Sequence, residues 1–149
     1  MRELYQSLLT AWNRREAGEM SDLFVADGSI VGFDGSQHVG SVDIETDLGR
    51  IFSMHATPSF VAIVREVRFL TPGAALLRAV AGLVPSGATD VDPAGNSIQS
   101  LVAVRQHHRW RIAHYHVTPA AFHGRPEERS DEHTSELQSH SDLVCRLLL

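Results

Sequence analysis

Apolar residues at the start of the chain recur every three or four positions, as they do on one face of an amphipathic helix. Leu4, Leu8 and Trp12 share that face. The spacing predicts a helix over residues 2–16, which Gly18 interrupts.

A second short helix and a hairpin are predicted next. Residues 19–25 place apolar side chains at helical spacing, and the Ala-Asp-Gly sequence of residues 26–28 ends this helix. Asp34-Gly35 separates the short strands expected at 29–33 and 37–39, and an Asp-Gly pair in that setting is the strongest short-range hairpin signal. Ser41 is placed to cap a third helix. The apolar face of this third helix comprises Ile44, Leu48, Ile51 and Phe52.

After Pro58 the pattern changes to strands. Four long runs rich in β-branched and aromatic residues cover 60–69, 74–84, 97–106 and 109–117, and a loop with two Pro and two Gly spans 85–95. Three helices followed by a meander predict an α+β domain, a cone-shaped, curved antiparallel sheet packed on three N-terminal helices. The mouth of such a cone is a natural ligand cavity.

Composition and charge narrow the class of partner. The chain has 149 residues, 13 Arg, no Lys and 18 acidic residues, and the body up to residue 124 is nearly neutral without a basic cluster. This predicts binding to neither nucleic acid nor an anionic membrane. No apolar run is long enough to span a bilayer, and a single cysteine makes no internal disulfide. We therefore expect a cytoplasmic protein that binds small molecules or other proteins.

The last 21 residues differ from the rest. Residues 129–140 (Arg-Ser-Asp-Glu-His-Thr-Ser-Glu-Leu-Gln-Ser-His) have no apolar periodicity and resemble the translated read-through of a common sequencing adapter, with one mismatch at Asp131. We interpret 1–128 as the domain and 129–149 as a non-native, disordered tail that can be removed with little loss of stability.

Several segments resemble the signatures of the SgcJ/EcaC family within the SnoaL-like, or nuclear transport factor 2-like, superfamily. These segments are Arg78-Ala-Val-Ala-Gly-Leu-Val-Pro85, Asn96-Ser-Ile-Gln-Ser-Leu-Val-Ala-Val104, Trp110-Arg-Ile-Ala113 and Thr118-Pro-Ala-Ala-Phe-His-Gly-Arg-Pro-Glu127. The resemblance covers residues 1 to about 127, and it departs at His116-Val117, where the family carries Gln-Asn. It implies the cone-shaped fold, a bacterial natural-product setting and an oxidoreductase label.

The sequence offers no site for the electron carrier that an oxidoreductase needs. It contains no Gly-x-Gly-x-x-Gly turn, no phosphate-binding loop ending in Gly-Lys and no cysteine set for an iron–sulfur cluster. We therefore expect no cofactor, and the oxidoreductase label stays an alternative.

Two histidines on the last strand are the leading candidates for chemistry. His114 and His116 are two residues apart and would share a face with Trp110 and Ile112. A pair of histidines supplies two metal ligands where three or four are normal, so we expect no metal and a polar pocket instead. His116, closest to the strand end, is the tentative proton shuttle at the cavity mouth, with His114 in the pocket.

Other polar residues have two interpretations each. Arg78 either binds a carboxylate ligand in the pocket or pairs with Glu66 on the neighbouring strand. Gln99 either binds a carbonyl or hydroxyl of the ligand, or makes a cross-strand hydrogen bond or a dimer contact. By analogy with ketosteroid isomerase, a carboxyl could move a proton, and the candidates are Asp27, Asp34 and Glu66. Asp27, ahead of the first strand, and Asp34, in the hairpin turn, are both expected to be structural.

The remaining predicted pocket residues are aromatic or imidazole side chains: Trp12, Phe33, Phe52 and His55, with His38 as a further candidate. Together these features predict a pocket for a small hydrophobic molecule of natural-product type, with acid–base chemistry as the first hypothesis. A non-catalytic ligand-binding module is the alternative. We also expect a homodimer through the uncovered sheet face, including Val61, Ile63, Val67 and Phe69 or their register partners.

Overall fold

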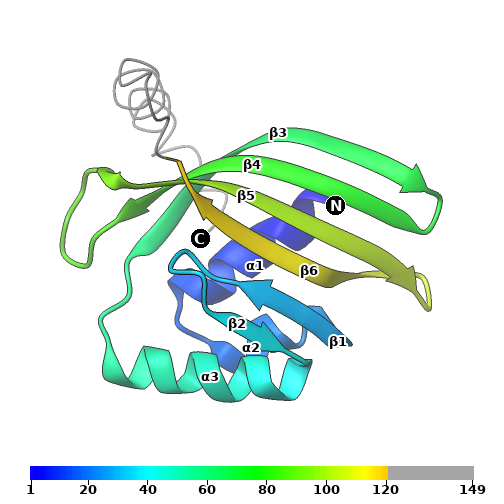
Figure 1. The fold of residues 1–149 in the computed structure, drawn as a ribbon, viewed down its shortest axis with the longest axis horizontal. Helices are drawn as coiled ribbons and strands as arrows, with labels where there is room; N and C mark the ends of the chain where they lie inside the picture. The colour runs from blue at the N-terminus through cyan, green and yellow to red at the C-terminus, as the bar shows by residue number, and fades with distance from the viewer. Residues whose placement is uncertain (121–149) are drawn as a thin grey trace.

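The structure, a computed structural model, describes residues 1–120 of the chain (Figure 1). The predicted tail at 129–149 therefore lies outside the described residues and stays a prediction. The elements, in chain order, are α1 (Arg2–Asn13), α2 (Ala17–Ser21), β1 (Phe24–Val31), β2 (Gln37–Val39), α3 (Ser41–Met54), β3 (Ser59–Thr71), β4 (Ala74–Val84), β5 (Asp92–Gln106) and β6 (Arg109–Pro119). No helix in this part of the chain has the length and apolarity needed to cross a membrane.

All six strands form one curved sheet in the order β2-β1-β6-β5-β4-β3. The neighbours β3 to β6 pair antiparallel, as predicted for the meander, and β1 pairs antiparallel with β2. The exception is β1 with β6, which run parallel, so the sheet is mixed. Figure 1 shows the sheet arching over α1, with α3 beyond the β1–β2 hairpin. The predicted α+β architecture, with helices on one face of a curved sheet, is confirmed.

The first strand begins earlier than predicted, and the second helix ends earlier. Phe24 and Val25, expected in a helix, form the start of β1, and Phe24 pairs with Ile112 of β6. A short apolar run fits a helix or a strand equally well, and here pairing with β6 decides for the strand. The same pairing places Asp27 within β1, where it is exposed, rather than ahead of it.

The start of α3 also differs from the prediction. Gly40, with φ of 91°, is the N-cap residue, and Ser41 is the first residue of the helix without a capping hydrogen bond. The Gly40 N–H donates to the Gly28 carbonyl at 2.7 Å. A positive φ favours glycine at this position. The backbone hydrogen bond of Gly40 therefore couples the start of α3 to β1 without a side-chain cap.

The core lies between the concave face of the sheet and the helices. Its members include Tyr5, Leu8 and Leu9 of α1, Ile44 and Leu48 of α3, and Leu77, Leu101, Ile112 and Tyr115 of the sheet. Several concave positions hold alanine: Ala62, Ala75, Ala79, Ala81 and Ala103. Small side chains there let the helices approach the sheet closely.

Two β-bulges decide which side chains face the core. The β3–β4 register shifts between Val64 and Glu66, and the β5–β6 register shifts so that Val102 pairs with His114 while Ala103 pairs with Ile112. A bulge adds one residue to one strand, so every residue beyond it moves to the opposite face.

The first bulge corrects the predicted outer face of β3. Val61 and Ile63 face outward, whereas Val67 packs against the core and the Phe69 ring lies 5.8 Å from Trp110. Outside, Val61 and Val91 form a small separate cluster with Ile63, Val80 and Val84. The outward apolar positions of β4 and β5 that are half-buried in a single copy include Leu76, Val80, Ile98, Val102 and Val104.

Candidate functional site

A cavity of about 380 Å³ opens between the helices and the end of the sheet where β4 and β6 finish. Its walls are mostly apolar, and polar side chains enter it from the β1–β2 hairpin and from the segment between α3 and β3. The lining residues from the helices and strands include Trp12, Met20, Ile30, Leu48, Ile51, Phe60, Leu83, Tyr115 and Val117. The size is in the range of small-molecule sites.

Side chains near the end of α1 fix one wall of the cavity. The Trp12 indole N–H donates to the Pro58 carbonyl at 2.8 Å, and Arg15 donates to the Thr57 carbonyl at 2.6 Å. Asn13 accepts from the Phe60 N–H at 2.8 Å and donates to the Phe60 carbonyl at 3.1 Å. These four bonds hold residues 57–60 against α1 and keep the wall in place without a ligand.

A chain of polar groups runs along the hairpin side of the cavity. The His38 Nδ1 lies 2.8 Å from an Asp47 carboxylate oxygen, and its Nε2 lies 3.5 Å from the Ser36 hydroxyl. Ser36 in turn donates its N–H and its O–H to Asp34, at 2.9 and 2.6 Å. The two hydrogen bonds from Ser36 hold the Asp34 carboxylate within the turn, where a structural role was predicted, and they lower the pKa of Asp34.

Thr57 offers a second polar group. Its side chain lines the cavity and is buried, and its hydroxyl has no hydrogen-bond partner among residues 1–120. Because buried polar groups are normally paired, an unpaired hydroxyl facing a cavity is available to a ligand.

The Gln99 amide lies within the core rather than in the cavity. Its oxygen accepts hydrogen bonds from the Tyr5 hydroxyl at 2.6 Å and the Tyr115 hydroxyl at 2.7 Å. Burial raises the pKa of both tyrosines, so both hydroxyls remain protonated donors. Since Tyr115 also lines the cavity, this three-residue network supports the cavity floor, and the second interpretation of Gln99, a hydrogen bond within the sheet region, is the one that the structure favours.

The structure brings only part of the predicted pocket together. Trp12, Phe33, His38 and His55 all line the cavity. Phe52 packs edge-on against Trp12, with ring centroids 5.2 Å apart, and is absent from the lining.

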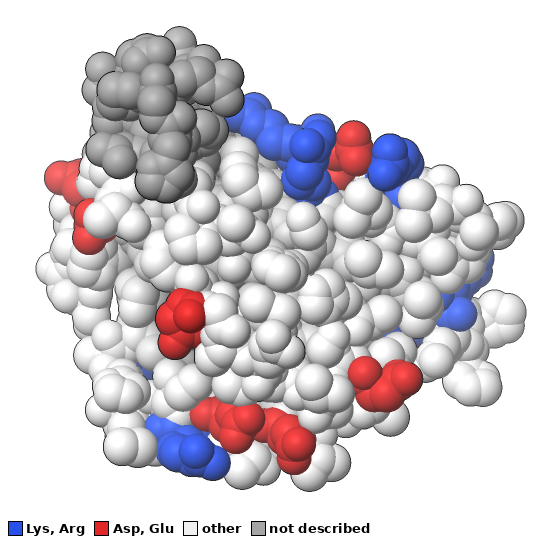
Figure 2. Space-filling view, viewed as in Figure 1, with Lys and Arg blue, Asp and Glu red and all other residues white. Residues whose placement is uncertain are grey.

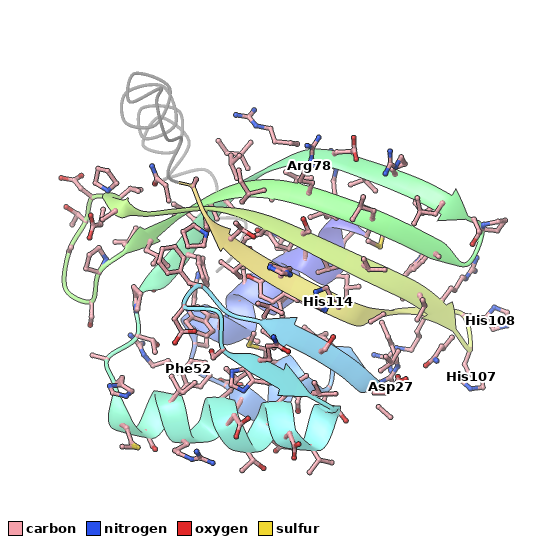
Figure 3. All side chains as sticks on the ribbon, viewed as in Figure 1. Asp27, Phe52, Arg78, His107, His108 and His114 are labelled. Carbon is pink, nitrogen blue, oxygen red and sulfur yellow. The ribbon has the colours of Figure 1, made fainter. Side chains whose placement is uncertain are left out.

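Arg78 is excluded from the pocket by its position on the opposite face of the sheet (Figure 3). Its guanidinium lies 3.6 Å from the Glu66 carboxylate, directly across the β3–β4 pair. The predicted alternative, an ion pair between neighbouring strands, is therefore confirmed. Both groups are partly exposed, so the pair contributes little to stability.

His114 and His116 also lie on the outer face, which corrects the expectation that they face the cavity. The His114 Nδ1 is 2.7 Å from the Ser29 hydroxyl, and its Nε2 is 3.4 Å from His116. The bulge at Ala113 is the physical reason: Trp110 and Ile112 face the core as predicted, and the extra residue turns the next two histidines outward.

The outer-face histidine pair predicts a pH dependence of stability. Burial, and then the neighbouring His116, lower the pKa of His114 below its ordinary value of about 6.5. The unfolded chain therefore binds a proton there more readily than the folded chain, and stability falls as the pH drops below about 6.5. His114→Gln should reduce this acid-side loss in urea titrations, and His108→Asn, at the exposed β5–β6 turn, should leave it unchanged. Equal pH profiles for His114→Gln and the wild type would contradict the assignment.

Sequence reasoning missed the pairing of His38 with Asp47. The signal was present but indirect: Asp47 follows Ile44 by three residues and precedes Ile51 by four, so it lies beside the buried face of α3. His38 pairs with the core residue Ile30 across the hairpin, which turns its ring inward. Only the packing of α3 on the hairpin joins the two.

Metal ligation finds no support at this site. Within residues 1–120, no three side chains of the His, Cys, Asp and Glu types gather closely enough to hold an ion. His38 and Asp47 bind each other, and Asp34 is engaged by Ser36.

Sequence and structure comparisons place this architecture in a known family. The SnoaL-like domain profile matches residues 1–121, so the chain belongs to the SnoaL-like domain family. No curated protein matches the chain.

Solved structures share the fold at low identity. A domain of unknown function with a cystatin-like fold from Nostoc punctiforme has a TM-score of 0.76 at 20% identity, over 98% of this chain and 93% of that one. A ketosteroid isomerase-like protein from Erwinia carotovora has a TM-score of 0.63 at 16% identity, over 80% and 93%. A proposed dehydratase of the NTF2-like family from Streptomyces avermitilis has a TM-score of 0.64 at 16% identity, over 80% and 92%.

Proposed function

We propose that the cavity binds a small, mostly apolar molecule and that the protein performs acid–base chemistry on it. The observation that carries this proposal is a preformed cavity of about 380 Å³ with apolar walls and a few convergent polar groups, His38 and Thr57 among them. Such a combination is typical of small-molecule sites, where apolar walls supply affinity and polar groups fix orientation. The ketosteroid isomerase-like and dehydratase-like neighbours support acid–base chemistry by analogy of fold.

The finer family assignment is part of the same proposal. The segments at 78–85 and 96–104 support membership of the SgcJ/EcaC family, and with it a natural-product substrate. The oxidoreductase activity that the family label names would require an electron carrier bound inside the cavity. The nearly apolar walls of the cavity support the alternative, a module that binds a ligand without catalysis.

Binding is tested with the neutral fluorescent dye Nile red and with native mass spectrometry of the purified protein. We expect saturable enhancement of the dye fluorescence and competition by any small molecule that co-purifies. Absence of saturable binding across a panel of apolar probes of this size would contradict a ligand-binding function.

We further propose a homodimer through the outer face of the sheet, now assigned to Leu76, Val80, Ile98, Val102 and Val104. The helices cover the concave face, and these outward side chains are half-buried in a single copy. Apolar residues at alternate positions on neighbouring central strands favour association with an identical face.

Light scattering should report twice the chain mass of 16.4 kDa, and Val102→Arg should give monomers. The charge would be placed without an opposite partner in the centre of the paired faces. Val67→Arg would not test the dimer, since Val67 faces the core and the charge would disturb folding. A wild-type protein that remains monomeric at micromolar concentration would overturn the dimer.

A further inference from the structure

We propose that His38 is the catalytic acid–base residue of the cavity, that Asp47 positions it, and that the substrate is a neutral, mostly apolar molecule with a weakly acidic hydroxyl, a phenol or an enol. This inference rests on the proposed function, because it requires a ligand in the cavity. It replaces His116 as the proton shuttle, since His116 lies on the outer face.

The contact with Asp47 determines which ring nitrogen can react. Asp47 Oδ2 lies 2.8 Å from the His38 Nδ1, and a carboxylate only accepts hydrogen bonds, so Nδ1 carries the proton in the neutral ring. The other nitrogen, Nε2, is then the one with a free electron pair. The side chain of His38 is 13% exposed and lines the cavity, so this nitrogen is largely shielded from bulk water.

The neighbour of Nε2 leaves that electron pair available. The Ser36 hydroxyl lies 3.5 Å from Nε2. It donates its proton to Asp34, whose carboxylate oxygen is only 2.6 Å away. Ser36, His38 and Asp47 lie next to one another in space, as in a catalytic triad. The serine is nevertheless not activated as a nucleophile, because its proton goes to Asp34 and not to His38. The arrangement is that of a base held by a carboxylate.

The proton transfer requires only the ligand hydroxyl, His38 and Asp47. The O–H bond of the ligand breaks with its electron pair left on the ligand oxygen, and an N–H bond forms at Nε2. The imidazolium that results is stabilised by the Asp47 carboxylate, whose other oxygen lies 3.4 Å from Arg50. Reversal of the step at another ligand atom returns the proton, so no oxidant, reductant or metal is required.

The surroundings of the base select the class of ligand. Among residues 1–120, Asp34 is the one lining residue with a permanent charge, and no arginine of this part of the chain lines the cavity. Figure 2 shows acidic side chains around α3 and the hairpin, with basic side chains beside them at the lower left, and arginines interspersed with acidic groups along the upper edge over the sheet. A carboxylate or phosphate ligand would meet like charge and no cationic partner. A neutral hydroxyl can instead donate to Nε2 and leave the rest of the molecule in the apolar part of the cavity.

The test uses para-nitrophenol, whose anion is distinguished from the neutral form by its visible absorption. Bound to the wild type, the probe should have an anion-to-neutral ratio about tenfold higher than when bound to His38→Gln at the same pH, because only the wild type offers a base next to the hydroxyl. Asp47→Asn should lose a large part of this effect. The matched control is His55→Gln, which changes a cavity histidine that pairs with no carboxylate among residues 1–120. This variant should retain the raised anion-to-neutral ratio.

The outcomes separate this inference from the proposed function. Equal ionisation of the bound probe in the wild type, His38→Gln and Asp47→Asn would overturn the role of His38 and leave the cavity as a binding site. Failure of para-nitrophenol to bind, with Nile red still binding, would overturn the substrate class. If circular dichroism shows that His38→Gln does not fold, the comparison of the wild type with Asp47→Asn decides. Asparagine still offers Nδ1 a hydrogen-bond acceptor, so this variant keeps the contact with His38 and removes only the negative charge.

Discussion

Gln99→Leu is expected to destabilise the protein by about 2–4 kcal/mol in urea unfolding. The substitution removes the one acceptor that both the Tyr5 and Tyr115 hydroxyls use, and leaves two fully buried donors unpaired. Each unpaired buried hydroxyl costs about 1–3 kcal/mol. Part of this cost is offset, since the Gln99 amide nitrogen, which has no partner among the described residues, is removed with the oxygen.

The origin of the effect is tested by removing the donors as well. The triple variant Tyr5→Phe/Gln99→Leu/Tyr115→Phe should recover most of the lost stability, because apolar groups of similar shape then replace the whole network. Ser100→Ala, on the outer face next to Gln99, should change the free energy of unfolding by less than about 0.5 kcal/mol. A triple variant as unstable as Gln99→Leu would show that packing, not hydrogen bonding, sets the cost.

Ile51→Trp is expected to weaken Nile red binding at least about tenfold, which corresponds to about 1.4 kcal/mol. Ile51 extends from α3 into the cavity, so a larger side chain there occupies space that the ligand needs. Because the cavity is open space in the structure, the indole should enter it with little strain on the fold. Fluorescence titration gives the affinity and thermal melting gives the stability.

The matched control is Met54→Trp, on the same helix and 68% exposed. It adds the same side chain to α3 without entering the cavity, so Nile red affinity should equal that of the wild type. Similar losses in both variants would place the dye elsewhere on the surface of α3.

Long periodic segments were predicted well from the sequence. The bounds of β4 were predicted as 74–84, α3 lies where its apolar spacing predicted a helix although Gly40 rather than Ser41 caps it, and the Asp34-Gly35 hairpin is where the turn chemistry placed it. Each of these elements is determined by side chains within the element itself. The spacing of apolar residues, or a turn that requires glycine, carries the whole signal.

The β-bulges carry no comparable signal, and they account for the errors that matter for function. Strict alternation along β6 would place Trp110, Ile112, His114 and His116 on one face, and one extra residue at Ala113 reverses the last two. Arg65 has the same effect on β3, where Val67 turns to the core and Phe69 turns to the concave side beside Trp110. Whether a strand bulges depends on its pairing with neighbours distant in sequence.

The candidate site was therefore only partly predictable. Aromatic residues such as Trp12 and Phe33 were placed correctly because large aromatic side chains are more often buried than exposed. The contact of His38 with Asp47 joins a short edge strand to a helix, and no spacing rule connects the two. It becomes visible only when α3 is packed against the hairpin.

The location of the bound ligand is the most direct test of the central claim, and methyl NMR of the wild type with para-nitrophenol measures it. We predict nuclear Overhauser contacts from the probe ring to cavity methyl groups, those of Ile30, Leu48, Ile51, Leu83 and Val117. The methyl groups of the outer face, those of Ile63, Val80, Ile98 and Val102, should show none. Contacts confined to the outer face would contradict the assignment of the cavity as the functional site.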